Sequence, residues 1–379
     1  MAVIVIAVVA LAVILVPRRV TPLSHGPTAP DAARDFTSAQ ISRSAALAAS
    51  LQPNALISLV LSLLISAALG LTSLGARIVT VAAKPLGGGW VWQVLLGSLA
   101  LAVIGRLATL PLSAYAENVR RRYGLSTRDW ALWTVDVAKS VAIGVALTGL
   151  ILVILYGSMR LAAQWWWAIA ACTVAGLVVL ASFCYPVVIE PVFNTFESMP
   201  QSQLRTDLLA LAERDEVVVY DTLLDSESSA VIETIVAHEL GHSKNKDVLL
   251  GTALGALGAA AMVVAGFLLA GWTPLLSRAG AASLSDPRSL ALVLFVVAVA
   301  GLVLTPVQSM VSRRIESRAD AHALELTRDP ASFLEMHRRL GVGNLADLDP
   351  NRLYYWMLPL TRALWTGSPR PGTGRRPTA

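Results

Sequence analysis

The sequence predicts an all-α polytopic membrane protein, and composition and hydropathy pattern carry this prediction. Of the 379 residues, 55% are hydrophobic and only 15% are charged, whereas soluble domains average about 45–50% apolar and about 25% charged residues. The mean hydropathy is +0.63. The apolar residues lie in long runs that are apolar on every face, as expected for helices surrounded by lipid. A soluble globular protein, a disordered chain and a disulfide scaffold are therefore excluded.

Each predicted membrane helix is a mostly apolar run, because a helix needs about 20 such residues to cross a bilayer. Seven runs qualify: 2–16, 55–76, 90–112, 140–159, 165–188, 248–272 and 289–310. The first run is short and starts at Met1, so a signal-peptide core is the alternative interpretation. We favour a retained helix, because the run lacks a charged leading region and an obvious small-residue cleavage site.

Positive charge is distributed unequally between the loops that join these runs. Loops 17–54 and 113–139 and the tail after the seventh run are rich in arginine, whereas the opposite set of loops is poorer. The positive-inside rule then places the N-terminus outside and segments 190–247 and 311–379 in the cytoplasm. We expect an integral, multi-pass protein of a bacterial-type plasma membrane. The loops also account for the net charge of +5, so no nucleic-acid partner is expected.

Three residues inside the apolar runs need separate interpretation. Cys172 and Cys184 lie in one run, and we interpret them as small apolar packing residues. Arg106 lies inside the third run, where a charge is costly unless it faces protein or water. One interpretation is that the Arg106 side chain snorkels toward the membrane surface or forms a structural ion pair. The other interpretation is that it is part of the wall of a water-filled cavity.

The segment His238-Glu-Leu-Gly-His242 has the spacing of a metal site. Residues four apart share one face of a helix, so His238 and His242 can bind one metal ion. Glu239 is one step round the helix and is the candidate general base for a water that attacks a peptide bond. The motif also occurs by chance, and the alternative is the exposed polar face of an ordinary helix.

A third ligand is expected, since catalytic zinc usually has three protein ligands and one open position. Glu316 and Asp320 are also four apart. We predict that Glu316 completes the site for one Zn²⁺ ion and that Asp320 accepts a hydrogen bond from a ligand histidine. His322 and Glu325 are the weaker alternatives for the third ligand. The expected reaction is peptide hydrolysis without a covalent intermediate, on peptide or protein substrates.

With these motifs the sequence resembles the M48 zinc metallopeptidases of the Ste24 type, the CAAX prenyl protease 1 branch. Three further segments, Tyr123–Thr127, Pro186–Asn194 and Val219–Leu223, are similar to stretches of that family. The resemblance covers roughly residues 55–357. It implies helices that enclose a chamber, with a gluzincin-like site facing inward. It also implies a membrane domain over 1–189 with five candidate helices and a peptidase domain over 190–365. The Gly/Pro/Arg-rich residues 366–379 are predicted to be disordered.

The sequence departs from the family pattern at two places. Leu211–Tyr220 runs directly into the Val219–Leu223 stretch. Members of the family usually have an additional segment here with the residues Asn-Ala-Tyr, which resembles an edge strand that pairs with the substrate backbone. This sequence lacks that segment. The tail at Tyr354–Arg362 lacks the family's motif histidine. A degenerate relative that binds zinc but cleaves poorly is therefore the alternative to an active endopeptidase. A transporter or channel is less favoured, because no inverted repeat is found.

Overall fold

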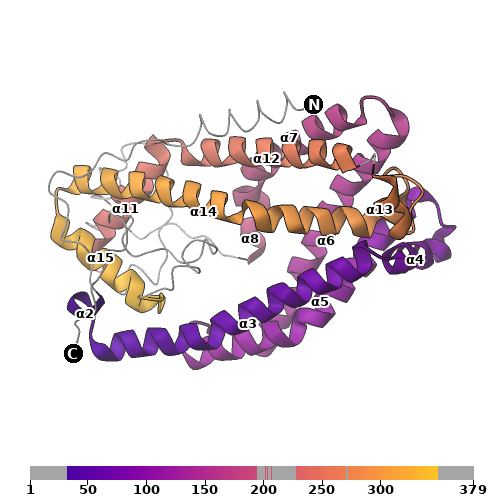
Figure 1. Ribbon diagram of the computed structural model, residues 1–379. Helices are drawn as coiled ribbons and strands as arrows, with labels where there is room; N and C mark the ends of the chain where they lie inside the picture. Colours follow the sequence, from indigo (N-terminus) through magenta and orange to yellow (C-terminus); the bar gives the residue numbers. More distant parts are fainter. Residues whose placement is uncertain are drawn as a thin grey trace, which may run out of the picture. The chain divides into compact units, whose positions relative to one another are not determined.

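A computed structural model describes residues 32–193, 228–269 and 272–348, together with Gln201, Gln203 and Thr206. The described residues form helices, turns and loops, without strands (Figure 1). Six helical segments are long and apolar enough to cross a membrane: Ser38–Gly70, Trp90–Arg122, Trp130–Leu161, Trp166–Val192, Asp247–Val264 and Pro287–Thr327. They confirm six of the predicted spans as helices. The remaining predicted span, 2–16, lies outside the described residues.

The helices are numbered in chain order. Their bounds are α2 Ala32–Asp35, α3 Ser38–Gly70, α4 Ser73–Ala83, α5 Trp90–Arg122, α6 Trp130–Leu161, α7 Trp166–Cys184, α8 Glu190–Phe193, α11 Ser229–Lys244, α12 Asp247–Leu269, α13 Thr273–Arg278, α14 Leu290–Thr327 and α15 Pro330–Gly343. Short 3-10 turns at Lys84–Leu86 and Pro287–Ser289 and a π-helical turn at Tyr185–Ile189 complete the described helical elements.

One predicted boundary is wrong for a local reason. The apolar run 55–76 was expected to be one helix, but α3 ends at Gly70 and α4 begins at Ser73. Thr72 has an extended backbone, and its hydroxyl accepts a hydrogen bond from the Leu74 amide at 3.2 Å. A side-chain oxygen at this position satisfies one of the unpaired amides of a new helix. The hydroxyl thus starts a second helix inside the apolar run.

Helix α14 joins two predicted features into one element. The predicted span 289–310 and the segment holding Glu316 and Asp320 form one helix of 38 residues, with Pro306 inside it. At 1.5 Å per residue, such a helix is about 57 Å long, well beyond the roughly 30 Å of bilayer hydrocarbon. A helix of this length can cross the membrane and still carry polar residues outside it.

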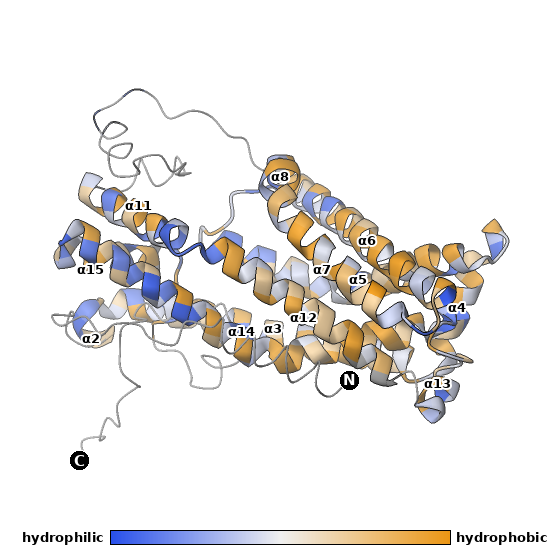
Figure 2. Cartoon of the chain, turned by 90° about the horizontal axis from the view of Figure 1, so that it is seen from above, coloured by the Kyte–Doolittle hydropathy of each residue, from blue (hydrophilic) through white to orange (hydrophobic). Residues whose placement is uncertain are grey.

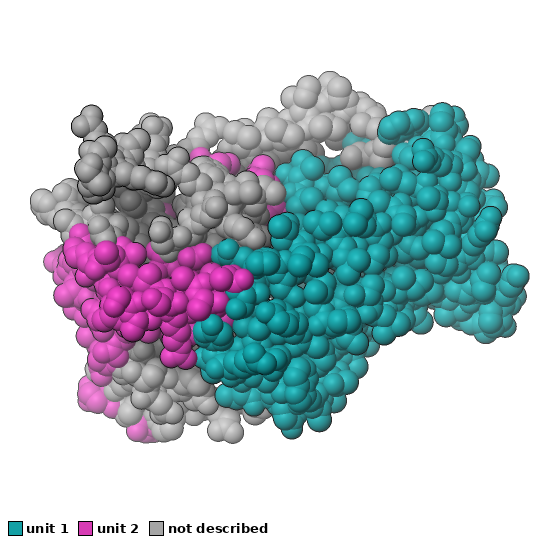
Figure 3. All heavy atoms as spheres, turned by 60° about the horizontal axis from the view of Figure 1, so that its bottom comes forward, with its two compact units in different colours: residues 1–15, 50–195, 251–304 teal, residues 16–49, 196–250, 305–379 magenta. Residues whose placement is uncertain are grey.

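The chain divides into two compact units, which Figure 3 shows in different colours. Unit 1 consists of residues 1–15, 50–195 and 251–304, and unit 2 of residues 16–49, 196–250 and 305–379. The core of unit 1 includes the fully buried Val79, Val94, Tyr156 and Leu290. Long stretches of α3, α5, α6 and α12 are hydrophobic in Figure 2. The predicted domain boundaries at residues 189 and 365 stay predictions.

The loop after α5, which contains the family-like stretch Tyr123–Thr127, is tied to a buried carboxylate. Glu117 is 1% exposed. It accepts a hydrogen bond from the Ser126 hydroxyl at 2.6 Å and from Arg128 at 3.1 Å. Arg121, one turn after Glu117, donates to it at 3.3 Å and stacks over Trp130. These contacts pair the buried charge of Glu117, which would otherwise be costly, and attach the loop to α5.

Unit 2 has its own small core, formed by α11, α14 and α15. Val231, Ala237, Ala323, Phe333 and Met336 are buried there. Hydrophilic residues alternate with apolar ones along α11 and α15, as Figure 2 shows. The metal-site motif lies on α11.

Candidate metal centre

Helix α11 presents both motif histidines, as the spacing predicted. Its start is marked by Ser228, whose backbone is extended and whose carbonyl accepts the first helical hydrogen bond, from Ile232 at 3.0 Å. Val231, Ile232 and Val236 are among the buried residues of the helix. His238 and His242 are half-buried. Both imidazoles are therefore partly enclosed on a helix that is itself packed into unit 2.

Gly241 allows α11 to approach α14 very closely. A Cβ atom added at Gly241 would lie 2.9 Å from the Cα of Ala319 and 3.2 Å from the Cβ of His322. Real Cβ atoms do not approach other atoms this closely, so any side chain here would force the helices apart. Ala319 is itself completely buried. The small residues bring the Glu316 segment of α14 beside the histidines.

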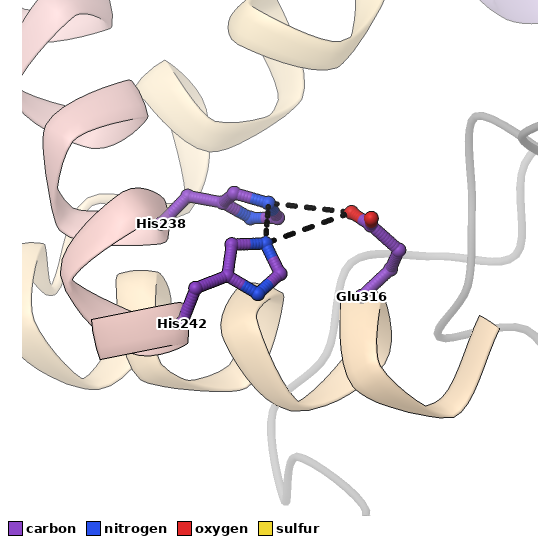
Figure 4. Close-up of side chains that lie close together, drawn as sticks. All are labelled: His238, His242 and Glu316. Atoms are coloured by element: carbon purple, nitrogen blue, oxygen red, sulfur yellow. Dashed lines mark hydrogen bonds and ion pairs between the residues drawn. The ribbon is translucent and has the colours of Figure 1, made fainter. Parts of the chain in front are cut away.

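Three ligand atoms of the predicted site meet in space. Nε2 of His238 is 3.2 Å from Nε2 of His242 and 3.4 Å from Oε2 of Glu316. Nε2 of His242 is 4.0 Å from the same oxygen of Glu316. Figure 4 shows both rings on α11 and the carboxylate on α14 pointing toward one another. Glu316, not an alternative residue, is therefore the third member of the cluster among the described residues.

The other ring nitrogen of each histidine faces a carboxylate. Nδ1 of His238 is 2.9 Å from Oδ1 of Asp320, and Nδ1 of His242 is 3.0 Å from Oδ2 of Asp247. A neutral imidazole carries one N–H, and a carboxylate close to Nδ1 favours this position for it in both rings. The lone pairs on both Nε2 atoms then face each other and the Glu316 carboxylate. Such an arrangement of electron-rich atoms requires a cation or a proton between them.

The pKa of His238 reflects this demand for positive charge. Burial lowers the pKa, but hydrogen bonds to Asp320 and Glu316 and the charges of both carboxylates outweigh burial and raise it to about 9. A proton therefore occupies the site near neutral pH when no metal is bound. A metal cation would satisfy the same charge demand in place of that proton.

The cluster fits a zinc ion. In a tetrahedral site, ligand atoms about 2.1 Å from zinc lie about 3.4 Å from one another, and the observed separations are 3.2, 3.4 and 4.0 Å. Two imidazoles and one carboxylate are also a donor set that catalytic zinc sites use. His238, His242 and Glu316 would thus occupy three corners of a tetrahedron and leave the fourth position open.

Three supporting residues of the site, Asp247, Arg318 and His337, were not predicted from the sequence. Arg318 forms an ion pair with Asp247, and Nε2 of His337, on α15, is 3.6 Å from Oδ1 of Asp320. Each carboxylate behind a ligand histidine is thus paired with a cationic or protonatable side chain. Asp247 follows His242 by five residues and begins α12. The sequence signal that could have identified Asp247 is an acidic residue so soon after a candidate ligand histidine.

The remaining sequence candidates are not members of the cluster among the described residues. His322 accepts a hydrogen bond at Nδ1 from the Lys244 ammonium, 3.3 Å away, which occupies its lone pair. Glu325 is exposed on α14 and outside the cluster. Glu239 is exposed on α11, and within the described part of the chain no hydrogen bond or ion pair is recorded for it. Glu239 thus follows His238 directly in the chain, with its side chain exposed.

The helices and the His–His–Glu cluster define a polytopic membrane protein with a metallopeptidase type of centre. Two family models match the chain: CAAX prenyl protease N-terminal, five membrane helices, over residues 20–195, and peptidase family M48 over residues 204–340. The chain belongs to the M48 metallopeptidase family and is of the Ste24 type. The sequence resemblance is therefore confirmed.

Several proteins are similar in sequence to part of this chain. The uncharacterized metalloprotease YhfN of Bacillus subtilis is 26% identical over 286 residues, which are 66% of each chain. CAAX prenyl protease 1 of Saccharomyces cerevisiae is 24% identical over 184 residues, 39% of this chain and 40% of that one. These alignments thus span less than two thirds of the relatives' own lengths. The crystal structure of S. mikatae Ste24p has the same fold, with a TM-score of 0.73, 18% identity and 97% coverage of both chains.

Proposed function

We propose that the protein is a membrane-embedded zinc endopeptidase that hydrolyses peptide bonds of protein or peptide substrates. The observation that carries this proposal is the convergence of His238, His242 and Glu316, with separations close to the edges of a zinc tetrahedron. Membership of the M48 family supports the reaction class. One relative is named CAAX prenyl protease 1. We therefore propose the C-terminal segment of a protein as the first substrate to test.

Each residue of the site has a definite part in this proposal. His238, His242 and Glu316 would hold one zinc ion. When bound, zinc supplies a Lewis acid that activates water and polarises the peptide carbonyl. Glu239 takes the proton of the attacking water and passes it to the leaving amine. Asp320 and Asp247 hold the imidazoles in the tautomer that directs Nε2 to the centre.

The arginine distribution supports a cytoplasmic location for the site. Loop 113–139 and the segment after α14 carry more arginine than loops on the opposite side, and positively charged loops are retained inside. We propose a bacterial-type plasma membrane, with α11 and α15 on the cytoplasmic side.

The proposal is tested by hydrolysis of a quenched fluorescent peptide by the detergent-purified full chain. We expect wild type to cleave, and a zinc chelator to abolish cleavage. Glu239→Gln should keep zinc but lose about 10²- to 10⁴-fold in rate, because it removes the general base. Glu233→Gln changes a carboxylate on the same helix outside the cluster and is the matched control, expected to cleave like wild type.

A second outcome corresponds to the degenerate relative that the sequence suggests. If wild type is folded and holds one zinc ion per chain but cleaves no peptide, the chain binds metal without proteolysis. The absence of the family's edge segment before Val219–Leu223 favours this alternative. If wild type holds no zinc, both interpretations are wrong.

A further inference from the structure

Unit 1 contains a cavity of about 500 Å³ between α3, α5, α6 and α14. Its volume lies within the range of about 300–1,000 Å³ that is typical of small-molecule sites. The lining residues of α5 run from Ser98 to Thr109 along one face of the helix, a length of about 16 Å at 1.5 Å per residue. The lining is mostly apolar, with Ile65, Leu69, Leu101 and Phe295 among its members.

Arg106 is the charged side chain in this lining. Its Nη1 is 3.4 Å from the Ser113 hydroxyl, a long contact, and its buried Nε has no hydrogen-bond acceptor among the described residues. The structure also records no ion pair between Arg106 and any described carboxylate. A guanidinium inside an apolar helix is costly unless an anion or water meets it. The cavity therefore presents a positive charge that the described protein residues do not neutralise.

The cavity is kept open by glycines on facing helices. Gly105 on α5 and Gly144 on α6 both line it, and a Cβ atom at either position would have no atom within 4 Å. Helix interiors disfavour glycine relative to alanine by about 1 kcal/mol. Neither helix packing nor backbone conformation requires glycine here, since no neighbouring atom approaches and neither residue has a positive φ. Glycine at these positions leaves space for a guest molecule.

We propose that this cavity binds a single-chain anionic amphiphile, with its phosphate or carboxylate head at Arg106 and its chain along the apolar lining. The planar guanidinium can bind either head group through two parallel hydrogen bonds. Leu69, Leu101 and Phe295 would then cover the chain, which explains why most of the other lining residues are apolar. The proposal goes beyond peptide hydrolysis and does not depend on it, because every residue used here belongs to unit 1.

Native mass spectrometry of the full chain in a neutral detergent tests the proposal with dodecyl phosphate as the probe. We expect one saturable molecule per wild-type chain. Arg106→Gln should weaken binding by about ten- to hundredfold, because a charged hydrogen-bond donor is lost. Arg106→Lys should lose less, since the charge stays while the two-pronged geometry is lost. Gly144→Leu should abolish binding by filling the cavity.

The matched control is Gly176→Leu, on α7, which also fills open space but does not line the cavity. This variant should bind dodecyl phosphate like wild type. Inorganic phosphate tests the head group alone and dodecanol tests the chain alone, and neither should bind in a saturable way at the same concentration. If Arg106→Gln fails to fold, Arg106→Lys and Gly144→Leu decide the outcome.

Three results would overturn the proposal. They are no saturable binding to wild type, unchanged binding in both the Arg106 and Gly144 variants, and equal binding of inorganic phosphate or dodecanol. Measuring the same binding in the Glu239→Gln background separates this result from the peptidase proposal, because the probe reports on the cavity whether or not peptide is cleaved.

Discussion

At the residue scale, each candidate ligand histidine depends on a carboxylate behind it. Asp320 lies 2.9 Å from His238 and Asp247 lies 3.0 Å from His242. These contacts orient the rings and keep both Nε2 atoms available to a metal. Asp320 was predicted for this role from its spacing to Glu316, whereas Asp247 became visible only in the structure. Both assignments lead to measurable effects on zinc binding.

Asp247→Asn should weaken zinc binding by about 10- to 100-fold, because the amide no longer fixes the tautomer of His242 as firmly. The measurement is competition for zinc against a chromophoric chelator. Asp286→Asn is a matched control, since Asp286 is also paired with an arginine, Arg288, but lies in unit 1. Equal zinc affinity of the Asp247 variant and wild type would exclude the proposed positioning role.

The raised pKa of His238 predicts how zinc affinity varies with pH. Metal-free His238 has a pKa of about 9, so near pH 7 zinc must displace its proton. Apparent zinc affinity should therefore rise about tenfold per pH unit up to about pH 9 and then level off. Zinc competition titrations across this range measure it.

The Asp320→Asn variant provides the control for this pH dependence. The variant loses a hydrogen bond and a charge that raise the pKa of His238. The pH at which zinc affinity levels off should therefore move downward, while the affinity itself falls. A plateau that stays at the wild-type pH would show that Asp320 does not set this pKa.

At the scale of elements, the site depends on the close packing of α11 against α14. Gly241 and Ala319 are small enough for the two backbones to approach, and this approach carries Glu316 to the histidines. The sequence predicted that each pair of motif residues lies on one face of a helix, because residues four apart in a helix are neighbours whatever the rest of the chain does. It did not predict that the Glu316 segment continues the membrane span as one helix, since nothing in the local pattern distinguishes continuation from a short turn.

Gly241→Ala tests the close packing. The added methyl group would meet the Ala319 backbone at 2.9 Å, so the helices must separate, at a cost of about 1–3 kcal/mol. We expect lower zinc affinity and a lower thermal midpoint, measured on the purified full chain. Gly343→Ala, on α15 in the same unit, has open space around its Cβ and should leave both quantities unchanged. A Gly241→Ala variant with wild-type zinc affinity would contradict this account.

At the scale of the whole molecule, the arginine distribution predicts how the chain lies in the membrane. Leu86, in the turn between α4 and α5, should lie outside, and Arg338, on α15, should lie in the cytoplasm. Both side chains are exposed. Single-cysteine variants Leu86→Cys and Arg338→Cys, made in a background with Cys172→Ala and Cys184→Ala, test this orientation.

An impermeant maleimide added to intact cells should label Leu86→Cys and leave Arg338→Cys unlabelled until the membrane is opened. Labelling in the opposite order would place the metal-site helices outside the cell. Labelling of both variants in intact cells would mean that an odd number of membrane crossings does not separate the two positions.

The sequence by itself determined the helical membrane class and the identities of His238, Glu239, His242, Glu316 and Asp320 as candidates. Hydropathy runs and four-residue spacings are local, and a helix converts them into faces without help from distant segments. Tertiary structure alone placed His322 beside Lys244 and outside the cluster, and added Asp247, Arg318 and His337. It also placed Arg106 in a cavity rather than in an ion pair. These facts depend on contacts between segments far apart in the chain, which a local pattern does not encode.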